Sequence, residues 1–268
     1  MTRVLVVMGL TLVIHAVDTM SYSVRVAGVQ TRRLAVAFSL FNIIVLISRT
    51  ANLIQAPIVG SLVDQAIALR RSAILLGEFR LIILSATAGS ILGALLLPAF
   101  VDLLGQGIKA VEGSGSVPRV LAKSLSPWRM FHVLRGLKLP RREPVHLSLE
   151  GLPRGVLLLN VLATAIYTIG VLAAIYAGAL VPEYRLTASQ LSGIINGLAT
   201  ILLTVVVDPV AALLTDQALA GSRPVTEVVA MVIWLVIGKV MGTLLGQVIF
   251  LPAASLVIFL TRLLVIRG

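Results

Sequence analysis

RLIILSATAGSILGALLLPAF, residues 80–100 of the chain, carries one charged side chain, and that one stands at its first position. A helix rises about 1.5 Å per residue and the hydrocarbon layer of a membrane is about 30 Å thick, so about 20 apolar residues cross it. This stretch has that length. It therefore predicts a transmembrane helix and places the chain among the membrane proteins.

Other stretches of the same kind along the chain predict six spans, which we place near residues 4–22, 34–55, 80–100, 155–181, 186–207 and 228–251. The apolar sequence continues to about residue 266, but too few residues follow Pro252 for another span. They predict a helix extension or an interfacial segment. The chain is 58% hydrophobic and 12% charged, with a mean hydropathy of +1.05, which is far from the composition of soluble domains.

The distribution of charged residues indicates which kind of molecule the protein contacts. The chain holds 22 Lys and Arg residues against 11 Asp and Glu, and most of the excess lies in loops and at helix ends. This distribution suits anionic lipid headgroups and argues against nucleic acid, which would call for a solvated basic domain with stacking aromatics. Cysteine is absent, so disulfides and thiolate chemistry are excluded. The first apolar run shows no cleavage pattern and predicts a retained span.

A repeated pattern divides the chain into two halves. Pro57 is followed at a fixed spacing by Asp64-Gln-Ala, and Pro209 is followed at the same spacing by Asp216-Gln-Ala. The Gly89 and Gly93 pair of the first half matches Gly242 and Gly246 of the second. These matches indicate an ancient duplication, although small residues also serve helix packing alone.

Each copy holds three spans, and because three is odd the second copy must be inverted in the membrane. We therefore predict an all-α integral membrane protein of two inverted three-helix repeats, residues 1–112 and 155–268, joined by the basic connection 113–154. Pro57 and Pro209 predict a hinge in each repeat, where the helix bends or breaks. Alternatively, each proline begins a short interfacial helix after a complete span.

The long connection between the halves, counted from residue 101 to 155, holds nine Lys or Arg residues against four Asp or Glu. Aromatic and leucine residues from Trp128 to Leu137 alternate with basic ones and predict an interfacial amphipathic helix. The positive-inside rule places this connection in the cytoplasm and both termini outside.

Polar residues interrupt the predicted spans in a regular way. In the first span one stripe covers about a quarter of the helix surface and comprises Thr11, His15, Asp18, Tyr22 and Arg25. His15 and Asp18 are candidates for a proton relay or an ion pair, and a histidine satisfied within the bundle is the alternative. Arg25 is a candidate anion ligand, or a side chain that reaches toward the membrane surface.

Arg49 lies deep in the second span, where an arginine costs about 2.5 to 3.5 kcal/mol, so it requires a partner or a wet cavity. Its planar donor fork suits phosphate, and a buried ion pair with Asp18 is the alternative. Lys239 is the corresponding cation of the last span. Asn52, Gln55 and Asn196 add amides to these polar faces, although such groups often only join helices.

Two strings, HAVDTMSYSVRVAGV at residues 15–29 and SRTANLIQAP at residues 48–57, resemble the Amj family of bacterial lipid II flippases. The second string is the more specific, and length and span count agree across the chain. The resemblance implies export of lipid II, the undecaprenyl-pyrophosphate-linked precursor of peptidoglycan, as an alternative to MurJ-type flippases. It also implies a multi-pass protein of the bacterial plasma membrane that contacts membrane lipids and needs no cofactor.

With that cargo, Arg49, Arg25 and Lys239 are expected to hold the diphosphate, whereas Tyr22, Asn52, Gln55 and Asn196 line the path of the sugars. No metal site and no nucleotide-binding loop is expected. Two other functions remain open: a membrane phosphatase of polyprenyl pyrophosphate, and a proton-coupled transporter of a small anion. A homo-oligomer also remains open.

Overall fold

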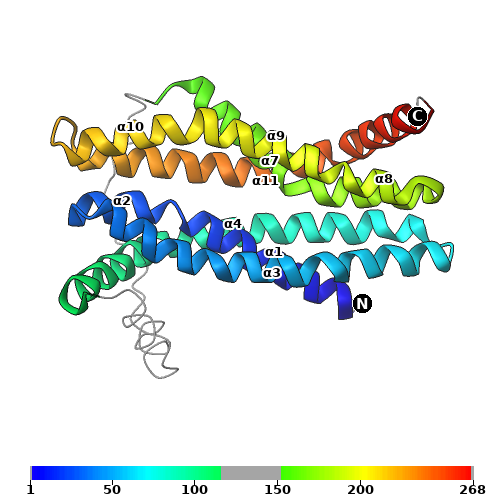
Figure 1. Ribbon diagram of the computed structural model, residues 1–268, viewed down its shortest axis with the longest axis horizontal. Helices are drawn as coiled ribbons and strands as arrows, with labels where there is room; N and C mark the ends of the chain where they lie inside the picture. The colour runs from blue at the N-terminus through cyan, green and yellow to red at the C-terminus, as the bar shows by residue number, and fades with distance from the viewer. Residues whose placement is uncertain (1, 116–151, 267–268) are drawn as a thin grey trace.

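The computed structural model describes residues 2–115 and 152–266, and every regular element in those two ranges is helical. Figure 1 shows these helices as a long bundle in two layers. The first layer holds α1 (Thr2–Met20), α2 (Ser23–Thr31), α3 (Leu34–Ala68) and α4 (Ser72–Ser114). The second holds α7 (Arg154–Leu180), η1 (Pro182–Tyr184), α8 (Arg185–Gln190), α9 (Ser192–Leu202), the π-helical turn η2 (Leu203–Val207), α10 (Asp208–Leu219) and α11 (Val225–Ile266).

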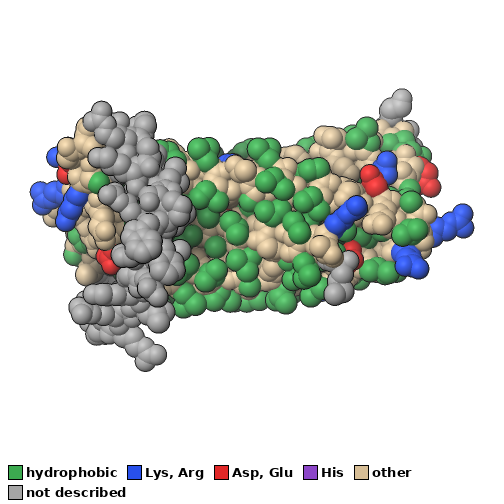
Figure 2. Space-filling model, turned by 90° about the horizontal axis from the view of Figure 1, so that it is seen from below, with side chains coloured by type: hydrophobic (Ala, Val, Ile, Leu, Met, Phe, Trp, Pro, Cys, Tyr) green, Lys and Arg blue, Asp and Glu red, His purple; other side chains and the backbone are tan. Residues whose placement is uncertain are grey.

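Six helical segments are long and apolar enough to cross a membrane, as the sequence predicts. The sequence underestimated their length, because α4 continues to Ser114 and the expected connection therefore begins later than residue 101. The residues after Pro252 extend α11 to Ile266, which decides between the two alternatives for that region. The amphipathic helix expected near Trp128 lies outside the described residues. Figure 2 shows charged side chains toward both ends of the bundle and a hydrophobic band between them.

The two layers run through the bundle in opposite directions. In Figure 1, α1 begins at the end of the bundle where both termini lie, whereas α7 begins at the opposite end. The order of crossings is the same in both layers, since α3 returns beside α1 and the α8 to α10 segment returns beside α7. We call residues 2–114 the first half and residues 154–266 the second half.

Glycines let two helices of each half approach closely. A Cβ added to Gly89 of α4 would lie 2.3 Å from the carbonyl oxygen of Leu12 in α1. A Cβ added to Gly242 of α11 would lie 2.6 Å from the carbonyl oxygen of Val161 in α7. Both distances are shorter than a carbon and an oxygen tolerate, so only glycine permits these helix crossings.

A dry seam joins the halves along α4 and α11. Phe79, Tyr176 and Phe250 form an aromatic cluster whose ring centroids are 5.5 to 6.2 Å apart. Gln247 of α11 donates a hydrogen bond from Nε2 to the carbonyl oxygen of Arg80 in α4, at 2.8 Å. Because Phe79 and Phe250 are fully buried, this side of the interface is packed like a protein core.

The first span is two helices, because side-chain hydroxyls take up carbonyl groups at the end of α1. Thr19 Oγ1 donates to the carbonyl oxygen of His15, and Ser21 Oγ donates to that of Asp18. Ser23 Oγ donates to that of Met20. Such local bonds compete with the helical ladder, so the backbone turns at residues 21–22 before α2 begins.

The two prolines expected to be hinges behave differently. α3 is helical on both sides of Pro57, so the expected break does not occur there. Before Pro209 the helix widens into η2, since a proline has no N–H to offer the carbonyl four residues earlier. The alternative of a separate interfacial helix is wrong for Pro57, because α3 passes through this residue to Ala68.

Gly89→Ala should destabilise the protein, because the new methyl group meets the α1 backbone, and overpacking of this kind costs about 1 to 3 kcal/mol. Gly105→Ala is the matched control, since a Cβ at this α4 position has no neighbour within 4 Å. The control should keep or slightly raise stability, by at most about 1 kcal/mol. Thermal unfolding of the two purified variants in detergent measures the difference, and equal midpoints would contradict the close crossing.

Candidate functional site

A cavity of about 680 Å³ lies between the halves, on the side of the bundle away from the dry seam. Side chains of α1, α2 and α3 line it from the first half, and side chains of α7, η2, α10 and α11 line it from the second. We call it the charged cavity, because five of its lining residues carry charge: Asp18, Arg25, Arg49, Asp208 and Lys239.

The polar stripe expected in the first span faces the space between the halves. His15, Asp18, Tyr22 and Arg25 line the charged cavity although α1 and α2 are separate helices. Thr11 lines a second cavity together with His15. The predicted common face is therefore confirmed, and the turn at residues 21–22 does not disturb it.

Arg49 is an exposed side chain of α3 that lines both cavities. The expected alternative, an ion pair between Arg49 and Asp18, is not among the ion pairs of the described residues. Asp18 instead accepts a hydrogen bond at 3.0 Å from Ser48 Oγ, which belongs to the residue before Arg49. The guanidinium forms no ion pair within the described ranges and hydrogen-bonds the side chain of Tyr167, which also lines both cavities.

Lys239 places a second cation in the charged cavity, from the opposite half. Its Nζ atom lies 5.9 Å from the centroid of the Tyr22 ring, a contact across the two halves. Attraction to a ring face is weaker than a carboxylate partner, and within residues 2–115 and 152–266 Lys239 forms no ion pair. The cavity therefore contains two cations, Arg49 and Lys239, that no acidic side chain neutralises directly.

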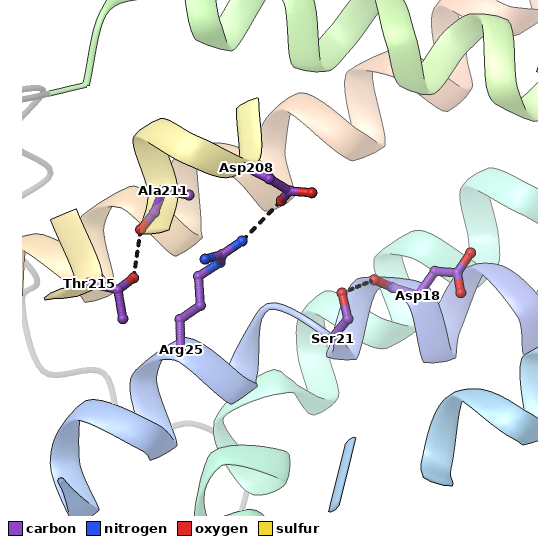
Figure 3. A network of polar contacts seen from close by, with 6 residues as sticks. All are labelled: Asp18, Ser21, Arg25, Asp208, Ala211 and Thr215. Carbon is purple, nitrogen blue, oxygen red and sulfur yellow. Dashed lines mark hydrogen bonds and ion pairs between the residues drawn. The ribbon is translucent and has the colours of Figure 1, made fainter. Parts of the chain in front are cut away.

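Arg25 differs from these cations because it is already paired. Its Nη2 atom lies 2.9 Å from Asp208 Oδ1 at the beginning of α10, and Figure 3 shows the side chain reaching across to that helix. The Arg25 side chain is 13% exposed and Asp208 is 57% exposed. Asp208 was missed at the sequence level. Its position, a carboxylate directly before a proline and after a long apolar run, is the signal that could have found it.

The second cavity, of about 640 Å³, lies closer to the end of the bundle where the termini are. Its walls come from α1, α3 and α4 of the first half and from α7, α8 and α9 of the second. We call it the neutral cavity, because among the described residues Arg49 is its one charged lining residue. Four residues were expected to line the path of the sugars. Gln55 and Asn196 line the neutral cavity, Tyr22 lines the charged cavity, and Asn52 lines both.

The two cavities have a common wall at the middle of the bundle. Five residues line both of them: Ile14, His15, Arg49, Asn52 and Tyr167. The two cavities therefore adjoin at the interface between the halves, with Arg49 on the wall that they have in common. Within the described ranges no three His, Asp or Glu side chains stand close enough to hold a metal ion.

A second ion pair bridges the halves near the neutral cavity. Arg185 Nη1 of α8 lies 2.9 Å from Asp64 Oδ1 of α3, and both side chains are exposed. The arginine belongs to the second half here, whereas Arg25 belongs to the first. The polar side of the interface therefore has one ion pair toward each end.

Comparison with known proteins agrees with this geometry. The model of the family described as Amj, Alternate to MurJ, matches residues 10–261. The chain belongs to the Amj family. It is 40% identical over 265 residues to the lipid II flippase Amj of Bacillus subtilis (strain 168), and the match covers 97% of each chain. No solved structure matches. Six spans and this bacterial Amj relative make the chain a multi-pass protein of the bacterial plasma membrane.

Cysteine labelling tests whether the Amj cavities hold water. The chain has no cysteine, so single substitutions give no background. Asn52→Cys should react with a water-soluble maleimide in native membranes, because a thiolate forms in a wet cavity. Leu46→Cys is the control, since Leu46 is an exposed residue of α3 that lines neither cavity and faces lipid. Equal labelling of the two positions would contradict a water-filled path.

Proposed function

We propose that this chain moves lipid II across the plasma membrane, without chemical turnover, through the polar path between its halves. The observation that carries the proposal is the pair of cavities that meet at Arg49, which forms no ion pair among the described residues. Membership in the Amj family and the name of the B. subtilis relative support lipid II as the cargo. The proposal requires a place for a diphosphate, a place for the polyprenyl tail and a way to change the open side.

The diphosphate belongs in the charged cavity. A bare diphosphate cannot enter hydrocarbon, because an isolated buried ion costs tens of kcal/mol in the idealised limit. Arg49 and Lys239 approach the cavity from opposite halves and offer guanidinium and ammonium donors to its oxygens. A phosphate held between them would connect the two halves through the cargo itself.

Arg25 is the third expected ligand, and its pairing with Asp208 gives it a further role. An arriving diphosphate competes with the Asp208 carboxylate for the same guanidinium. Where the diphosphate wins, α2 loses its ionic contact with α10, and the buried apolar cluster that includes Val24 and Leu214 is what still joins the two helices at this end. Binding of cargo is in this way coupled to opening, since the cargo contacts the open state better than the closed one.

The polyprenyl tail remains in the lipid. The outer face of α3 beside the cavities carries exposed apolar side chains, among them Leu46, Leu53 and Ile54. Leu53 lines the neutral cavity as well, so the path and the lipid-facing surface adjoin at this helix. With this arrangement the headgroup can lie in the cavities while the tail lies in the surrounding lipid.

We infer that the halves are inverted repeats that rock about the dry seam. The equivalent glycine crossings of α4 on α1 and of α11 on α7 support a duplication, as does their opposite direction. The ion pairs Arg25–Asp208 and Arg185–Asp64 then act as end contacts, one of which opens in each state. An inside-negative potential of about 100 mV favours outward movement of an anion by about 2.3 kcal/mol per charge.

Arg49→Ala should abolish flipping, and Arg49→Lys should impair it, because lysine lacks the planar fork that holds two phosphate oxygens. The measurement is surface-exposed lipid II in cells depleted of their other lipid II flippases. Arg262→Ala is the matched control, an exposed arginine of α11 outside both cavities. Failure of the wild-type chain to restore exposure at normal membrane levels would overturn the function itself.

The phosphatase alternative is tested with the same purified protein. Transport without turnover predicts that undecaprenyl pyrophosphate incubated with the wild-type chain releases no phosphate. Release that depends on His15 or Asp18, the polar pair of the charged cavity, would favour the enzyme instead.

Charge exchange tests the end contacts. Arg185→Asp and Asp64→Arg should each lower flipping, because a single exchange places like charges at 2.9 Å spacing. The double exchange restores the pair and should return flipping to within about twofold of wild type. The readout is again surface-exposed lipid II, at matched protein levels. Single variants as active as wild type would exclude this ion pair from the transport cycle.

A further inference from the structure

The two cavities differ in chemistry more than in size. The charged cavity holds Asp18, Arg25, Asp208 and Lys239 in addition to Arg49. The neutral cavity holds Arg49 alone, at the common wall, and elsewhere only uncharged polar and apolar side chains. A ligand that occupies both is therefore charged in one part and uncharged in the other.

Three hydroxyl groups of the neutral cavity can act only as acceptors toward a ligand. Thr11 Oγ1 donates its hydrogen to the carbonyl oxygen of Val7, and Ser189 Oγ donates to that of Arg185. Thr168 Oγ1 donates to the carbonyl oxygen of Thr164. Each hydroxyl has one hydrogen, which is already donated to the backbone. These three groups can therefore offer a ligand only their lone pairs.

Three further polar atoms of residues that line this cavity are buried without a partner in the described part of the chain, and two of them are amide oxygens, which accept hydrogen bonds. Among the described residues, Gln55 Oε1, Asn196 Oδ1 and His15 Nδ1 are buried and have no hydrogen-bond partner. Gln55 comes from α3 and Asn196 from α9, so each half contributes one amide. Asn196 reaches its place because Gly170 of α7 has no Cβ there; a Cβ would lie 2.1 Å from Asn196 Oδ1. Buried acceptors of this kind are stabilised by a donor from water or a ligand.

We propose, on the basis of the flippase function above, that the neutral cavity is a sugar subsite. It binds the uncharged part of the headgroup, whose hydroxyl and amide N–H groups donate to the amide oxygens of Gln55 and Asn196, and whose hydroxyl groups can donate to His15 Nδ1 or accept from it. The diphosphate stays at Arg49 on the common wall. The sugars therefore lie toward the end of the bundle that holds the termini. The charged cavity lies on the other side of the diphosphate.

The test compares two lipids that differ in this part of the headgroup. Lipid II and undecaprenyl pyrophosphate are titrated separately into the purified full chain in lipid nanodiscs. The variant Gln55→Leu/Asn196→Leu should bind lipid II about tenfold more weakly, since two hydrogen bonds to the sugar are lost. Its affinity for undecaprenyl pyrophosphate should change by less than about twofold, because the cations are intact. Gln106→Leu, an exposed amide of α4 outside both cavities, is the control.

The possible outcomes are distinct. Unchanged binding of lipid II, or an equal loss for both lipids, overturns the sugar subsite and leaves the flippase function standing. A wild-type chain that binds neither lipid overturns the flippase function instead. Thermal unfolding shows whether the double variant is folded, and the single variants Gln55→Leu and Asn196→Leu carry the same comparison if it is not.

Discussion

Cations that lie within the thickness of the membrane must be hydrated or neutralised, and this constraint shapes the whole interface between the halves. Arg49 and Lys239 stand at mid-helix positions of α3 and α11, and neither has a carboxylate partner among the described residues. A polar space must therefore surround them. The charged cavity is that space.

The two sides of the interface therefore differ in how the halves contact each other. On one side α4 and α11 meet through Phe79, Phe250 and their neighbours, with core-like burial. On the other side α3 faces the second half across the cavities, and ion pairs bridge the gap toward each end. Packed apolar surface resists separation, whereas an ion pair exposed on both sides, such as Arg185–Asp64, contributes little and exchanges partners readily. Relative movement of the halves is therefore easiest on the polar side.

Irregular backbone occurs where the cavity can accommodate it. The turn between α1 and α2 contributes Ser21 and Tyr22 to the charged cavity, and η2 contributes Leu203 and Thr204. Backbone groups that leave the helical ladder are tolerated at membrane depth only beside protein or water. Each irregular segment directly precedes the helix that carries one partner of the Arg25–Asp208 pair, so the regular backbone is interrupted near this pair in both halves.

The sequence by itself determined the six spans, the polar stripe from His15 to Arg25 and the depth of Arg49, because hydropathy and helical period are local properties that the membrane enforces. Only the tertiary structure decided which groups are paired. Asp18 bonds to Ser48 and Arg25 pairs with Asp208, a residue 183 positions away, so no local pattern reveals the contact. The continuity of α3 through Pro57, against the widened turn before Pro209, was likewise beyond the sequence, since the same residue permits either backbone response.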